Sequence, residues 1–179
     1  TFLFKEFDPS NSPTDPGIVK LPALTEYRYW YGIINFSSDP RKLFNVTTSA
    51  TWGNYFNGTR IGLLATFNYR IQPYGVISID ANYNKISLPT PYKSADIYLV
   101  GPRLDLTLTK SVFFTTFLQY NSQFNNMNIN SRFQWRFKPV SDLFIVYTDN
   151  YYYSFDQPNQ NFTAKNRALV LKLTYWLNM

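Results

Sequence analysis

The chain has 179 residues, which is enough for one domain over 1–179, and no break in composition marks a second. It has no cysteine and no histidine, which excludes a disulfide framework, thiol chemistry and the commonest general base and metal ligand. The net charge is +6, but Lys and Arg are scattered singly, without the basic run typical of a nucleic-acid partner.

The composition combines many aromatic residues with few charged ones. Aromatic residues make up 20% of the chain, and charged residues make up 16%. Soluble domains usually have roughly 25% charged residues. The mean hydropathy is nevertheless −0.28, close to neutral. A barrel wall with an apolar outer face and a wet inner face has this composition, because the two faces cancel in the average.

Taken in chain order, residues 1–7 are a candidate strand and the Pro-rich residues 8–23 form a loop. From about residue 24 onward, polar and apolar residues alternate with period two, which predicts strands separated by turns. The predicted strands are 25–38, 43–56, 59–71, 75–88, 96–109, 111–125, 127–138, 143–154 and 165–179. Soluble domains have strands of about five or six residues, whereas a tilted strand needs about 9–11 residues to cross a bilayer. The predicted lengths therefore favour a membrane-spanning sheet.

The turns between these strands have recognisable chemistry. Asn57–Gly58 predicts a two-residue hairpin. Pro40 and Pro73 lie in short turns, and residues 138–142 predict a longer one. Outer-membrane barrels have short periplasmic turns and longer outer loops, and their last strand ends at the periplasmic side. This rule places the turns near 39–42, 72–74, 110 and 139–142 in the periplasm and the connections 8–23, 57–58, 89–95, 125–126 and 155–164 outside, although two of these outer connections are tight hairpins.

The alternation assigns each strand residue to one of two faces. The apolar row should contact lipid, and it comprises Leu63, Phe67, Ile77, Ile79, Leu104, Leu106, Phe133, Trp135, Leu169, Leu171 and Leu173. The opposite row should face the lumen, and it comprises Arg60, Asp80, Asn82, Arg103, Asp105, Arg132, Arg136 and Lys172. A lumen with this surplus of positive charge is either a conduit for anions or a narrow interior filled by paired side chains.

The predicted fold is thus an all-β, antiparallel transmembrane β-barrel of about ten strands, or the C-terminal part of a larger barrel. The ten-strand version requires residues 1–7 to pair with 165–179. The alternative is a soluble all-β module that binds glycan or nucleic acid, with its apolar face turned inward. The sequence starts at Thr1 without Met, and we expect that a signal or an upstream region has been removed.

The last fifty residues resemble a known family. The segment NINSRFQWRFKPVSDLFIVYTDNYYYSF (128–155), followed by KNRALVLKLTYWLN (165–178), is similar to the C-terminus of a family of Bacteroidota outer-membrane proteins. Its members join an N-terminal domain similar to family-nine carbohydrate-binding modules to a large C-terminal barrel. This chain has no counterpart of the carbohydrate-binding domain. The resemblance implies a location in the cell outer membrane of a Gram-negative bacterium, and it supplies no catalytic residue.

The function expected from these features is not enzymatic. Asp80 and Asp105 fall on adjacent strands, but nothing positions a substrate between them as a glycoside hydrolase requires. Phosphate-binding loops and metal-ligand clusters are absent from the sequence. We expect no catalytic residue, metal or cofactor, and no nucleic-acid partner. The expected partners are outer-membrane lipid and other outer-membrane or surface proteins.

Overall fold

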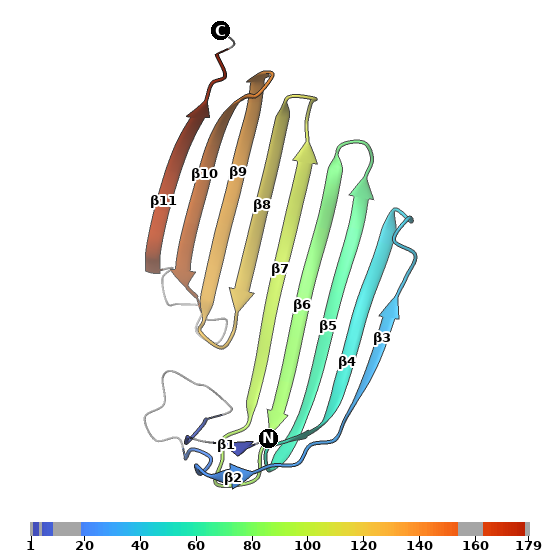
Figure 1. Cartoon of the computed structure of the whole chain (residues 1–179), viewed down its shortest axis with the longest axis vertical. Coiled ribbons are helices and arrows are strands. Elements are labelled where there is room, and N and C mark those ends of the chain that lie inside the picture. The colour runs from blue at the N-terminus through green and yellow to red at the C-terminus, as the bar shows by residue number, and fades with distance from the viewer. Residues whose placement is uncertain (1, 4, 9–18, 154–162, 178–179) are drawn as a thin grey trace.

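The computed structural model describes residues 2–3, 5–8, 19–153 and 163–177, and its main feature is an antiparallel sheet of nine strands. The strands lie side by side in chain order from β3 at one edge to β11 at the other (Figure 1). Their bounds are β3 Tyr31–Ser37, β4 Phe44–Tyr55, β5 Gly58–Ile71, β6 Gly75–Ser87, β7 Ala95–Thr107, β8 Val112–Asn121, β9 Asn126–Lys138, β10 Ser141–Tyr152 and β11 Thr163–Thr174. The prediction of an all-β antiparallel fold is confirmed, and each strand overlaps one predicted from about residue 24 onward.

A second, small sheet holds the N-terminal segment. β1 (Phe2–Leu3) pairs with β2 (Thr25–Glu26), and Phe7 forms an isolated bridge with Leu21. The prediction that residues 1–7 close a ten-strand ring against 165–179 is therefore wrong. Residues 1–7 alternate poorly, so they do not offer one apolar row to the large sheet, and the described residues pair with their own following segment. The β1–β2 sheet lies beyond one end of the large sheet (Figure 1).

The predicted strand 25–38 is divided in the structure. Only Tyr31–Ser37 joins the large sheet as β3, because the preceding residues turn away toward the rings around Phe56. Leu24 has a φ of 57° directly before β2, which marks the bend in the chain. Tyr27 and Tyr29 then pack their rings edge-on against Phe56, with centroids 5.2 and 5.8 Å away. Aromatic packing thus outcompetes strand pairing over this stretch.

The β4–β5 hairpin turns one residue earlier than its Asn57–Gly58 signal predicts. Tyr55 lies opposite Gly58, so Phe56 and Asn57 form the loop, and Phe56 takes the positive φ of 52°. Gly58 serves a different need, because a Cβ there would lie 2.1 Å from the carbonyl oxygen of Ser87. The glycine allows the start of β5 to approach β6 closely.

The large sheet has no second layer among the described residues. The solvent-accessible surface of the chain is 12559 Å², whereas a compact monomer of 21.0 kDa exposes about 9,000 Å². Among the described residues only three hydrophobic side chains are buried: Leu21, Ile86 and Tyr120. Leu63, Leu171 and many similar side chains are exposed on the sheet. The soluble sandwich alternative requires an apolar core, and the described residues do not form one.

Candidate functional site

The strand register determines which residues share a face, because directly opposite residues point the same way. Leu63 pairs with Tyr83, and Tyr83 pairs with Tyr98, and the same relation continues across the sheet. The resulting apolar face contains every residue that the sequence assigns to lipid: Leu63, Phe67, Ile77, Ile79, Leu104, Leu106, Phe133, Trp135, Leu169, Leu171 and Leu173. The alternation had therefore grouped these residues as the structure does.

The opposite side of the sheet is the polar face. Opposite pairs such as Thr66 with Asp80 and Thr115 with Arg132 define it. It contains every residue that the sequence assigns to the lumen: Arg60, Asp80, Asn82, Arg103, Asp105, Arg132, Arg136 and Lys172. That the apolar face meets lipid and the polar face meets water stays a prediction.

An uncharged band runs along the apolar face. On β6 it extends from Gly75 to Tyr83, and on β7 from Tyr98 to Leu106, which is nine residues on each strand. Nine residues in a strand cover roughly 27 Å, and a tilt of about 40° reduces the height to roughly 21 Å. The apolar band of outer-membrane barrels is about 25 Å tall. On β6 and β7 the band is therefore slightly shorter than the apolar band of such barrels.

Among the described residues, charge enters the apolar face toward one end only, close to the connection 88–94 and toward the ends Tyr152 of β10 and Thr163 of β11. The charged residues that the described pairing places there are Lys85, Asp96, Asp149 and Arg167. Asp96 is exposed and accepts a hydrogen bond from the Tyr83 hydroxyl at 2.7 Å. On β6 and β7 the interior of the band has none, whereas on β10 the uncharged stretch is shorter and runs from Leu143 to Tyr147 before Asp149. The two ends of the band are therefore chemically different.

A buried carboxylate cluster is the one feature of this face that the sequence did not predict. The Asp149 side chain is fully buried, and its Oδ2 accepts hydrogen bonds from the hydroxyls of Tyr147 and Tyr151 and from Nε of Arg167, the last at 2.7 Å. Asp149 lies opposite Arg167 in the β10–β11 pair. The sequence signal for this cluster is an aspartate flanked by two tyrosines on one face of a strand. A classification of residues as polar or apolar gives that spacing no weight.

The polar face has a charged end, near the turns 72–74, 108–111 and 139–140. Arg103 and Asp105 form an ion pair at 2.7 Å, and Thr115 donates a hydrogen bond to Asp105. Arg136 pairs with Asp142 at 3.2 Å. Three further basic residues form no ion pair with a described residue, namely Arg70, Arg132 and Lys172. This end therefore carries surplus positive charge.

The polar face also has an amide end, near the turns 56–57, 88–94 and 122–125. Its amide side chains on β6, β8, β9, β10 and β11 are Asn82, Asn84, Gln119, Asn121, Asn126, Asn128, Asn130, Asn150 and Asn166. Arg60 of β5 lies at this end, beside the amides of β6. Its Nε donates to Oδ1 of Asn84 at 2.9 Å, and Asn84 in turn donates to Asn82 at 2.7 Å.

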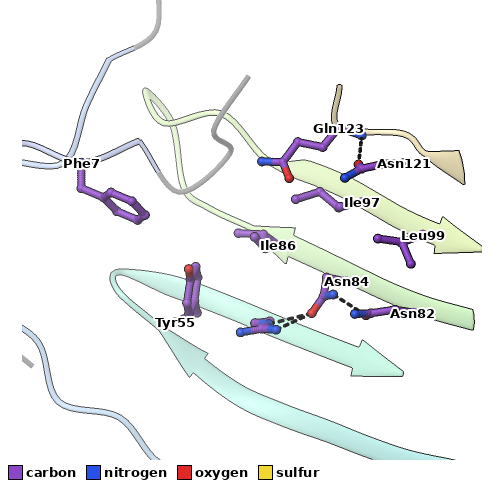
Figure 2. A pocket seen from close by; sticks show the side chains of 10 residues that line it. Phe7, Tyr55, Asn82, Asn84, Ile86, Ile97, Leu99, Asn121 and Gln123 are labelled. Carbon is purple, nitrogen blue, oxygen red and sulfur yellow. Dashed lines mark hydrogen bonds between the residues drawn. The ribbon is translucent and has the colours of Figure 1, made fainter. Parts of the chain in front are cut away.

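A pocket of about 410 Å³ opens at the amide end, beneath Phe7 of the N-terminal segment. Figure 2 shows Phe7 and Tyr55 on one side and Asn121 and Gln123 on the other. The ring of Phe7 also contacts that of Phe56 at 5.5 Å, which fixes the segment to the β4–β5 turn. No acidic residue lines the pocket within the described chain. The sequence pattern does not predict this pocket, because it favours residues 1–7 as a strand of the wall.

Comparisons with known proteins give no relative. A scan against family models, a search of curated proteins and a search of solved structures all found no match. The resemblance to the Bacteroidota barrel family therefore stays a prediction.

Two further observations concern chemistry and membrane helices. In the described ranges no three His, Cys, Asp or Glu side chains gather as a metal site requires. The residues described include no helix long and apolar enough to cross a lipid bilayer.

Proposed function

We propose that the chain forms part of the wall of a β-barrel in a Gram-negative outer membrane, as a non-enzymatic structural, accessory or transport-related component. The observation that carries the proposal is the uncharged apolar band, nine residues long on β6 and β7, whose side chains are half-buried or exposed on a sheet without a second layer among the described residues. Each Å² of apolar surface that stays exposed to water costs about 25 cal/mol of free energy. Contact with lipid removes that cost.

The aromatic residues support the same placement. On the apolar face Tyr83, Tyr98 and Tyr120 lie toward one end of the band, whereas Tyr69 and Trp135 lie toward the other. Tyrosine and tryptophan concentrate at the two interfaces of a bilayer, because each has an apolar ring and a polar group. The polar face then lines the barrel interior, and its charged end gives that interior a positive character.

The first experiment asks whether the purified chain depends on detergent or lipid. We expect a defined, folded species in detergent micelles and aggregation once the detergent is removed, followed by size-exclusion chromatography and far-UV circular dichroism. A chain that stays monomeric and folded in plain buffer contradicts the proposal and favours the soluble module.

The second readout asks which face meets lipid. Vesicles of phospholipids brominated in the acyl chain should quench a variant that keeps Trp135 and has phenylalanine at the other tryptophans. A matched variant moves the probe to the polar face by combining Trp135→Phe with Phe144→Trp, and its quenching should be weaker. Equal quenching of both probes contradicts the assignment of the faces.

A further inference from the structure

The pocket at the amide end has an unusual combination of lining groups. Two aromatic rings, Phe7 and Tyr55, lie on one side, and amide side chains from β6 and the end of β8 lie on the other (Figure 2). A primary amide offers two donor hydrogens and an acceptor oxygen within one group. Aromatic rings offer a flat apolar surface. The side-chain oxygens of Asn82, Asn84 and Asn121 each already accept a hydrogen bond within the chain, so these amides mainly offer donor hydrogens. A ligand for this pocket therefore needs several hydrogen-bond acceptors and also an apolar face.

The charges in the pocket exclude other classes of ligand. The described lining contains Arg60 but no acidic residue, so a cation has no counter-ion there. Nε of Arg60 already donates to Asn84, and its guanidinium lies over the Tyr55 ring at 5.6 Å, so it is a weak anchor for an anion. An apolar ligand would strip water from Asn82, Asn84 and Asn121 without replacing their hydrogen bonds.

We propose that this pocket binds a short neutral saccharide, with the Phe7 ring against the sugar ring, the edge of Tyr55 beside it, and the amides of Asn82, Asn84, Asn121 and Gln123 on its hydroxyls. The oxygens of the sugar hydroxyls accept hydrogen bonds from the amide hydrogens, and the C–H face of a sugar ring matches an aromatic surface. The volume of about 410 Å³ lies within the range of about 300–1,000 Å³ typical of small-ligand pockets.

The proposal goes beyond the proposed function, and the two fail separately. The detergent and bromolipid experiments report on the apolar face, whereas saccharide binding reports on the polar face. A soluble chain that binds a saccharide would overturn only the membrane assignment, and a membrane chain that binds none would overturn only this site.

The test titrates the full chain in detergent micelles with maltotriose, cellotriose, xylotriose and mannotriose, followed by isothermal titration calorimetry. Trigalacturonate is the acidic comparison. We expect at least one neutral trisaccharide to bind with a dissociation constant of about 1 mM or tighter. Saturation-transfer NMR of the unmodified chain should show transfer to that sugar's ring protons. Binding of trigalacturonate alone, or of none of the five, overturns the proposal.

Variants locate the binding. Asn84→Ala and Tyr55→Ala should each weaken the binding about five- to tenfold, which is the effect of losing one or two hydrogen bonds or one ring contact. The matched control is Asn35→Ala, which makes the same change on the polar face of β3, outside the pocket. The control should bind as the unmodified chain does. Equal affinity in all three variants overturns the site even if a sugar binds.

Discussion

At the residue scale, Asp149 shows how a charge is accommodated on an otherwise uncharged face. Its carboxylate is fully buried, and two tyrosine hydroxyls and the Arg167 guanidinium surround it. The Arg167 side chain itself remains 58% exposed, so the cluster buries the carboxylate and leaves the guanidinium accessible. The cluster fixes β11 to β10 at the end of the sheet where the pairing has a bulge, between Asn150 and Tyr151.

Asp149→Asn should lower the free energy of unfolding by about 2–3 kcal/mol, because hydrogen bonds to a charged group contribute about 1.5–3 kcal/mol and Arg167 loses its counter-ion. Urea unfolding in detergent micelles, followed by tryptophan fluorescence, measures the change. Asp96→Asn is the matched control, since Asp96 is an exposed acid on the same face with one tyrosine partner. The control should change the stability by less than about 0.5 kcal/mol. Equal effects would show that burial of Asp149 contributes nothing.

At the scale of the single strand, β11 carries the sharpest contrast between the faces. Leu171 lies opposite Ile145 on the apolar face, and the next residue, Lys172, lies opposite Phe144 on the polar face. A shift of one residue in register would exchange them. Neighbouring positions on one strand therefore test both faces in the same surroundings.

Leu171→Arg should cost about 2–4 kcal/mol in lipid vesicles, as expected for a basic side chain near the middle of a bilayer. Lys172→Gln should be mild, because a polar interior tolerates an uncharged polar side chain. Unfolding by urea in vesicles measures both changes. The opposite order, with Lys172→Gln the more harmful, would indicate a soluble sheet that buries the leucine row in protein.

The strands and their faces could be predicted because both depend on local alternation, which packing reinforces at every pair. Alternation alone does not predict where each strand ends. The turn at Phe56 and Asn57 is displaced by one residue because Phe56 packs on Phe7, Tyr27 and Tyr29, which are distant in sequence. The pocket was missed because it depends on side chains from separate segments that no spacing rule relates. The Asp149 cluster was missed because alternation by polarity gives no weight to two tyrosines flanking an aspartate on one face, and because Arg167 lies on another strand.

At the scale of the whole molecule, the two edges decide how a barrel could close. β3 and β11 each pair with a single neighbour among the described strands. In an antiparallel sheet of nine strands the first and last run in the same direction, so their direct pairing would be parallel. Every described pair is antiparallel, and single-chain bacterial barrels have an even number of strands. Backbone groups in lipid must be paired, so we expect further strands between these edges.

Cysteine pairs can test this expectation, because the chain has no native cysteine. Ile34→Cys, on β3, combined in turn with Leu169→Cys, Leu171→Cys or Leu173→Cys, should give no disulfide within one chain in micelles. Ile145→Cys with Leu171→Cys is the positive control, since these residues lie directly opposite each other. Non-reducing electrophoresis reads both. A bond between β3 and β11 within one chain would show that nine strands close on themselves.

The order of strands has a consequence for how the molecule assembles. Each strand of the large sheet touches only the strands before and after it in the chain, so the sheet is a linear series of hairpins. Such a series can grow by zipping, with each new strand adding to an edge that the previous hairpin has prepared. Loop closure at each step is short, which lowers its entropic cost. Damage to one hairpin should therefore stay local, and the sheet should lose strands from its edges inward rather than in a single step.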